Sequence, residues 1–312
     1  MNIAFYADHP YWGQLSNNGG TRTVLKSAAT LRELGHEVSI VAHKDKFTWF
    51  KHHKPVHSIP ANADHIIAVS ISDLKQLLRT YRGHARLGYW ARPYETWQMP
   101  MEKVLKWIRA LQKRNGVLMC NSSWQVEELA KNGIKARVMF AGLDEDWHAG
   151  DNRVINRIGC LCSKRASKRW DSFIRLHKML GPTFEFVAFG SIACNDAFLS
   201  QYLQNPSHED LERLYQSCAF FFCPNVREGF YNCGYEAALC GCLLLVSSYA
   251  ENGMSDYATP TTAHIFGSLE DAVAEIANAD FEKIPQMNRA LAAIGNRRTN
   301  MKRMVETLNE SN

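Results

Sequence analysis

The chain has 312 residues, of which 46% are hydrophobic and 21% are charged, and it contains no low-complexity run. This composition excludes disordered and fibrous proteins, and the length predicts about two domains. The longest nearly apolar run, Ala237–Val246, has about ten residues, too few for the ~20 of a membrane-spanning helix. Asp8 interrupts the start of the chain before a signal-peptide core is complete, so we expect a cytoplasmic protein, with peripheral attachment to a membrane as an open alternative.

Positive charge is concentrated in the first half of the chain. Residues 1–150 hold 20 Lys and Arg against 13 Asp and Glu, a net charge of +7, whereas residues 151–312 hold 16 against 18, a net charge of −2. Such a basic half is typical of a protein with an anionic partner: a nucleic acid, an acidic membrane surface or a phosphorylated substrate. A solvated basic surface without a partner is the other interpretation.

The nine cysteines form an odd set without the spacing of a disulfide framework. Cys160 and Cys162, like Cys240 and Cys242, lie in apolar, strand-like runs, and neither pair has the two-residue gap of most zinc knuckles. We therefore expect reduced, buried thiols and no metal site.

Short apolar runs alternate with helical patterns in the first half of the chain. The pattern predicts strands at residues 3–7, 37–42, 65–70, 86–90, 117–120 and 136–140. Helices are predicted at residues 20–35, 72–81, 101–114 and 124–131. A polar, acidic stretch at residues 143–153 then interrupts this alternation and is the predicted interdomain linker.

The same alternation resumes after the linker. Strands are predicted at residues 155–161, 184–189, 219–223 and 242–247, with helices at 170–180, 211–216 and 233–239 and a final amphipathic helix at 284–308. This βαβ alternation predicts parallel sheets covered by helices on both faces. We therefore expect an α/β protein with two doubly wound, Rossmann-like domains, residues 1–150 and 151–312, that face each other across a cleft. The last helix is expected to pack back on the first domain.

The segment with the clearest chemistry runs from Pro224 to Cys242 and has the pattern strand, loop, helix, strand. Glu228 lies at the loop end of the buried strand, and Glu236 lies one to two turns into the helix. The loop amides before Cys233 open a helix N-terminus, which stabilises an anion. Carboxylates beside such amides suit a ligand with both hydroxyl and phosphate groups, such as a nucleotide sugar. A capped surface loop with two solvated glutamates is the alternative.

This segment resembles the signature of retaining GT-B glycosyltransferases, in particular glycosyltransferase family 4. The matching residues are Glu228-Gly229-Phe230, Glu236-Ala237-Ala238 and Cys240-Gly241, with Tyr231 where the family prefers Gly. Further stretches follow in the family's order, so the resemblance spans nearly the whole chain: Asn18-Gly19-Gly20-Thr21, Ala141-Gly142-Leu143-Asp144 and the segment Ile158–Lys168. The family often has Arg where this chain has Cys160.

The resemblance implies a GT-B fold and the transfer of a hexose or related sugar from a UDP-sugar or GDP-sugar, with retention at the anomeric carbon and no required metal or cofactor. Arg165 and Lys168 would stabilise the diphosphate, and Glu228 would lie over the sugar ring as the third catalytic residue. The implied donor-binding residues are Glu236 for the ribose, the loop Gly229, Phe230, Tyr231 and Asn232, the glycines Gly19 and Gly20, and the backbone near Ser191 for the base.

The acceptor side carries fewer signals. Arg92, Tyr94 and Glu95 follow a predicted strand at its carboxyl end and are the expected acceptor or sugar contacts, although the aromatic residues there would also suit packing under the loop. Two basic aromatic stretches, residues 44–57 and 103–114, suit either an anionic membrane or a phosphate backbone. An ordinary outer helix of the sheet also explains residues 103–114.

Other functions stay compatible with the sequence. They are sugar transfer to modified DNA bases, a catalytically inactive GT-B module that binds a nucleotide or glycan, and an epimerase or phosphorylase. Glu228, Glu236 and the basic pair Arg165 and Lys168 occur together, which favours transfer because degenerate sites usually lose such a residue.

Overall fold

The computed structural model describes residues 1–7, 19–42, 55–92, 99–144, 146–248 and 253–310. The chain forms two compact units, one of Met1–Leu143 with Gly295–Asn312 and one of Asp144–Ile294. It therefore passes between the units twice, after Leu143 and after Ile294. Within the described residues no helix is long and apolar enough to span a membrane.

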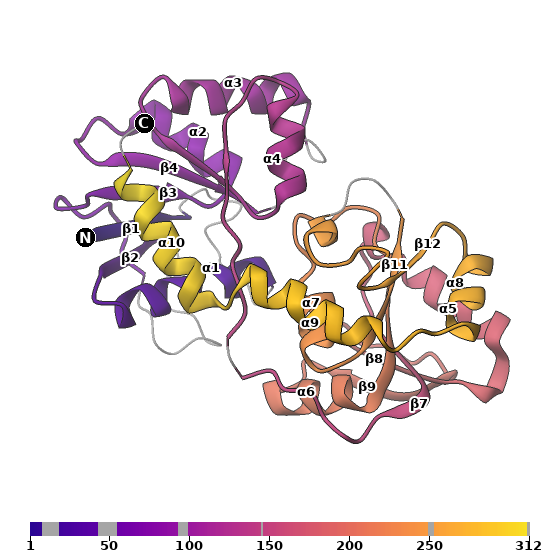
Figure 1. Cartoon of the computed structure of the whole chain (residues 1–312). Coiled ribbons are helices and arrows are strands. Elements are labelled where there is room, and N and C mark those ends of the chain that lie inside the picture. Colours follow the sequence, from indigo (N-terminus) through magenta and orange to yellow (C-terminus); the bar gives the residue numbers. More distant parts are fainter. Residues whose placement is uncertain (8–18, 43–54, 93–98, 145, 249–252, 311–312) are drawn as a thin grey trace. The chain divides into compact units, whose positions relative to one another are not determined.

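The first unit is built on a six-stranded parallel sheet with the order β2-β1-β3-β4-β5-β6 (Figure 1). The strands are β1 (Asn2–Tyr6), β2 (Glu37–Val41), β3 (His65–Ala68), β4 (Arg86–Ala91), β5 (Val117–Cys120) and β6 (Arg137–Val138). The helices are α1 (Gly19–Glu33), α2 (Ile71–Thr80), α3 (Met101–Gln112), α4 (Ser123–Ala130) and α10 (Arg297–Asn309).

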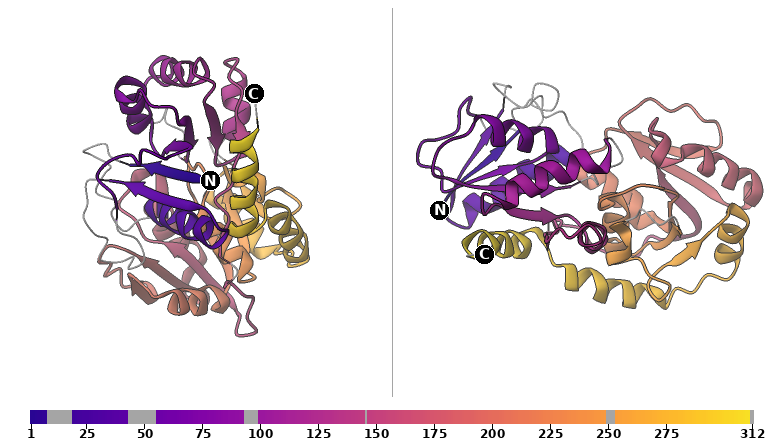
Figure 2. Two further views of the ribbon diagram at one scale, coloured as in Figure 1. Left: turned by 90° about the vertical axis from the view of Figure 1, so that its left-hand side faces the viewer. Right: turned by 90° about the horizontal axis from the view of Figure 1, so that it is seen from above.

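Two apolar layers lie on the two faces of this sheet. Leu74, Leu77 and Ile108 of α2 and α3 pack in one layer, and Val24 and Leu31 of α1 pack in the other. Helices α2, α3 and α4 thus cover one face, while α1 and α10 cover the opposite face, where they lie side by side (Figures 1 and 2). This arrangement buries strands on both sides, as in β3, where every residue is buried.

The second unit also has a six-stranded parallel sheet, with the order β12-β11-β10-β7-β8-β9. Its strands are β7 (Val154–Leu161), β8 (Glu185–Gly190), β9 (Leu199–Gln204), β10 (Cys218–Cys223), β11 (Leu243–Ser247) and β12 (His264–Phe266). The helices are α5 (Trp170–Leu180), α6 (His208–Ser217), α7 (Asn232–Leu239), α8 (Leu269–Ala277) and α9 (Lys283–Ile294).

The final helical stretch differs from the prediction of one helix over residues 284–308. Gly295, with φ of +81°, interrupts it, and Asn296 begins a new helix by accepting the amide of Thr299 at 2.8 Å. The break assigns α9 to the second unit and α10 to the first. In α10, Met301, Met304 and Leu308 are buried in the first unit's core.

Candidate functional site

The strand order of the second unit reverses between β7 and β10. Strands β7, β8 and β9 extend to one side of this point, and β10, β11 and β12 extend to the other. Ligands of open α/β sheets bind outside the carboxyl ends of the strands at such a switch point. The loop after β7 carries Lys168 and the loop after β10 carries Glu228, so both predicted residues lie beside the switch point.

Lys168 and Glu228 form an ion pair in which each side chain is only 14% exposed. The amide nitrogen Nδ2 of Asn225 donates to Oε1 of Glu228 at 2.8 Å, the same oxygen that contacts the ammonium group of Lys168. The two loops are also joined by a backbone hydrogen bond from Val226 to Ser167 at 3.1 Å. The carboxylate is therefore held from one side by two donors.

Tyr231, which stands where the resembled family prefers Gly, contacts the lysine of this pair with its ring. Its ring is almost fully buried and lies 4.5 Å from the Nζ atom of Lys168, a cation–π contact. Burial raises the pKa of the Tyr231 phenol well above its usual range, so the ring stays neutral. Phe230 packs against Tyr235 and Tyr257, with ring centres 5.4 and 5.5 Å apart, and this packing anchors the loop.

Helix α7 begins directly after Tyr231 without a side-chain cap. The first amides of a helix have no intrahelical acceptor, so Asn232 and Cys233 present donors beside the Lys168–Glu228 pair. Burial, followed by the charge of Glu236, raises the pKa of Cys233 to about 12. The thiol is therefore neutral at physiological pH.

Glu236 lies in the second turn of α7 and is held by a residue that the sequence analysis missed. The hydroxyl of the fully buried Tyr215 donates to Oε2 of Glu236 at 3.1 Å. Trp147 packs on Tyr215 with ring centres 5.6 Å apart and on His208 at 4.2 Å. Because Tyr215 comes from α6, sequence spacing around Glu236 gives no sign of it.

Two other predicted residues of this unit are exposed. Arg165 precedes a short 3₁₀ turn, Ala166–Lys168, and its backbone amide donates to Oγ of Ser163 at 3.2 Å. Ser191 follows β8, whose last residue, Gly190, allows close packing: a Cβ atom there would lie 2.5 Å from the carbonyl oxygen of Cys162. Both residues lie after carboxyl ends of strands, and neither joins the Lys168–Glu228 pair.

In the first unit, Gly19 and Gly20 are the exposed first residues of α1. Arg92, directly after β4, donates to the carbonyl oxygens of Gly20 and, at 3.0 Å, of Val69. These bonds tie the start of α1 to the carboxyl ends of β3 and β4. The predicted Tyr94 and Glu95, with most of the stretch 44–57, lie outside the described residues.

All nine cysteines are free thiols. Among the residues that the structure describes, no group of three or more His, Cys, Asp or Glu side chains is placed to hold a metal ion.

No protein-family model and no curated protein sequence matches the chain, but many solved structures do. HepE of Anabaena, solved in complex with UDP-glucose, is 14% identical with a TM-score of 0.75 over 99% of both chains. Sucrose-phosphate synthase from Thermosynechococcus elongatus is 12% identical with a TM-score of 0.75 over 98% of both chains. An alpha-glucosyltransferase solved with UDP and a 13-mer DNA containing an HMU base is 13% identical, with a TM-score of 0.67 over 99% of both chains.

At this level of identity the likeness establishes the fold. Two parallel six-stranded sheets covered by helices, in the order found here, confirm the predicted pair of doubly wound domains. The chain has the GT-B fold.

Proposed function

We propose that the chain is a retaining glycosyltransferase that moves a sugar from a UDP-sugar to an acceptor hydroxyl. The observation that carries this proposal is the Lys168–Glu228 pair at the switch point of the second sheet, beside the uncapped start of α7. The likeness to structures solved with UDP and UDP-glucose supports a uridine nucleotide over a guanosine nucleotide.

The cationic and N–H groups of the site would bind the diphosphate. The ammonium group of Lys168 and the amides that open α7 would neutralise the departing diphosphate, which stabilises charge where it develops in the transition state. Arg165, exposed on the same loop as Lys168, would add a second positive charge. These groups supply the electrostatic stabilisation in the proposed reaction, which requires no metal.

The two glutamates would bind hydroxyl groups. Glu236, fixed through Oε2 by Tyr215, would accept hydrogen bonds from the ribose. Glu228, held through Oε1 by Asn225 and Lys168, would use its other oxygen for a hydroxyl of the sugar. A carboxylate that is already oriented loses less freedom when the ligand binds.

Thermal unfolding with UDP, GDP, ADP, CDP and TDP, each with and without Mg²⁺, tests the donor site. A ligand that binds only the native state raises the melting temperature, and we expect a shift with UDP that does not require Mg²⁺. Lys168→Ala and Glu236→Ala should reduce this shift, whereas Arg175→Ala, on the exposed surface of α5, should leave it intact. Equal shifts in all three variants would reject the proposed site.

Transfer itself is tested with UDP-glucose. Release of UDP that depends on an added acceptor, with an α-linked product by NMR from the α-linked donor, would support retention. A β-linked product would show inversion, and loss of transfer with intact UDP binding would favour an inactive nucleotide-binding module.

A second candidate acceptor is a modified base in DNA. One structural neighbour is an alpha-glucosyltransferase solved with DNA containing an HMU base, and residues 1–150 of this chain carry a net charge of +7. Incubation with UDP-glucose and an HMU-containing oligonucleotide should then add the mass of one glucosyl group. An oligonucleotide with unmodified thymine is the control.

A further inference from the structure

The outer surface of α2 and α3 in the first unit is strongly basic. Residues 71–82 and 101–114 together contain eight exposed cationic side chains and one exposed acidic side chain, that of Glu102. Asp73, the other acidic residue of these ranges, is buried at the start of α2. We refer to these eight residues as the α2–α3 basic face: Lys75, Arg79, Arg82, Lys103, Lys106, Arg109, Lys113 and Arg114.

The ring of Trp107 lies beside one cation from each of the two helices. The guanidinium carbon of Arg79, on α2, lies 5.1 Å from the centre of the Trp107 ring, and Nζ of Lys106, on α3, lies 5.4 Å from it. Trp107 itself packs on the apolar layer under these helices. The ring therefore gathers cations from both helices around one aromatic group.

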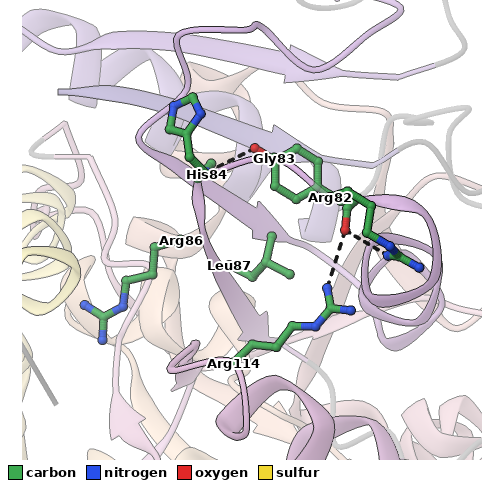
Figure 3. Close-up of a pocket in the computed structure, with 8 residues that line it drawn as sticks. Arg82, Gly83, His84, Arg86, Leu87 and Arg114 are labelled. Atoms are coloured by element: carbon green, nitrogen blue, oxygen red, sulfur yellow. Dashed lines mark hydrogen bonds between the residues drawn. The ribbon is translucent and has the colours of Figure 1, made fainter.

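At the carboxyl ends of α2 and α3 the basic face continues into a hollow of about 430 Å³, lined by Arg82, His84, Arg86 and Arg114 among others (Figure 3). Arg114 donates to the carbonyl oxygen of Leu78 at 3.0 Å, and Arg82 donates to that of Tyr81 at 3.0 Å. These bonds hold both guanidinium groups near the hollow. A guanidinium has five N–H donors, so each retains donors for an anion.

The apolar side chains of α3 face inward. Val104, Leu105, Ile108 and Leu111 are all buried in the layer between the helices and the sheet. In the described part of the chain the exposed large hydrophobic residues are Val56, Ile155 and Met179, and none of them lies on α2 or α3. Apart from the partly exposed ring of Trp107, which is surrounded by cations, the basic face thus offers charge and guanidinium groups, and it has no fully exposed large apolar side chain of the kind that membrane-bound amphipathic helices insert into a lipid bilayer.

We propose that the α2–α3 basic face binds the phosphate backbone of nucleic acid. Half of its cations are arginines, whose planar guanidinium groups match phosphate oxygens. Binding would be driven by the release of counterions from the phosphates and would not depend on base sequence. This inference goes beyond sugar transfer and does not rest on it, because the residues belong to a different unit from the donor site.

Fluorescence anisotropy with a labelled duplex of roughly 20 base pairs, titrated at several salt concentrations, tests the proposal. The test variant is Arg79→Gln with Lys106→Gln, and the control is Arg298→Gln with Lys302→Gln, which removes the same charge from α10 on the opposite face of the sheet. We expect the slope of log K against log salt to become shallower by about 1.8 in the test variant, since each lost phosphate contact changes it by about 0.9.

The control variant should keep the wild-type slope, and thermal melts would verify that both variants are folded. Three results would overturn the proposal: absence of duplex binding at low salt, equal changes of slope in the two variants, or stronger displacement of the duplex by phosphatidylglycerol vesicles than by unlabelled DNA at the same phosphate concentration. UDP-dependent stabilisation of the same variants reports on the donor site separately.

Discussion

Tyr215 holds a glutamate on another helix through one buried hydroxyl group. Tyr215→Phe removes the hydrogen bond to Glu236 but preserves the packing against Trp147 and Phe189. Without this bond the Glu236 side chain must be ordered when the ligand binds, at a cost of about 0.5–1.5 kcal/mol, so we expect the UDP affinity to fall by roughly 2- to 10-fold. Calorimetric titration with UDP measures this change. Tyr81→Phe, in the first unit, is the control, and an equal loss in that variant would contradict a positioning role for Tyr215.

The buried His65 should make the folding stability of the first unit decrease at acid pH. Burial, followed by the positive charge of Arg86, lowers the pKa of His65 below the usual value of about 6.5 for a histidine. The unfolded chain therefore binds a proton more readily than the folded chain, so stability is complete above about pH 6.5 and decreases as pH falls below it. Urea denaturation between neutral and mildly acidic pH should show a smaller decrease in His65→Leu than in the wild type. The exposed His84→Leu should behave like the wild type, and an unchanged pH dependence in His65→Leu would refute this assignment.

The sequence pattern indicated the charged residues of the candidate site but not the side chains that contact them. Lys168, Glu228 and Glu236 belong to local motifs, so their spacing was informative. Asn225 precedes the motif, and Tyr215 lies on another helix, so neither could be found without the strand order that brings α6 beside α7. The structure places Lys168, Glu228 and Glu236 in the second unit, but their role in donor binding stays a prediction, as does that of the amides, Arg165 and Ser191.

At the scale of elements, regular alternation made most strands and helices predictable. All six strands of the first unit were predicted, because apolar runs in covered parallel strands are nearly continuous. The sequence pattern did not indicate β9, a partly exposed edge strand with mixed side chains, or β12, which has three residues. Helix α8 was not predicted either, although Ser268 and Asp271 form a capping box at its start.

The turn before the first passage between the units depends on Gly142. Its φ is +65°, and a Cβ atom there would lie 2.5 Å from the backbone nitrogen of Arg297, whose amide bonds to Leu143 at 2.8 Å. Gly142→Ala should therefore destabilise the first unit by roughly 2 kcal/mol or more, through strain and a backbone clash.

Gly133→Ala is a matched control for that substitution. Gly133 has a similar φ of +70°, but a Cβ atom there would meet no atom within 4 Å apart from those of the adjoining residues. Urea denaturation of both variants separates the clash from the conformational strain that they share. Equal destabilisation would show that the contact with Arg297 does not constrain residue 142.

At the scale of the whole molecule, the described residues form two separate sheets, each with its own apolar core. Leu74 and Val24 lie in the layers of the first unit, and Phe173 and Phe222 lie in the core of the second. The proposed donor residues Lys168, Glu228 and Glu236 all belong to the second unit. Scanning calorimetry should therefore show that UDP raises the melting temperature of one transition and leaves the other nearly unchanged, because binding stabilises the part that forms the site. A single transition that shifts as a whole would show that the units unfold together.

Because α10 belongs to the first unit, the second unit is complete before the first unit during synthesis. The second unit has all its residues once Ile294 has left the ribosome, whereas the first still lacks Met301, Met304 and Leu308 of its core. Until these residues emerge, the apolar surface of α1 and the strands beneath it is incompletely covered. The nascent chain thus carries an exposed apolar patch throughout translation of its second unit, a state in which binding to chaperones competes with aggregation.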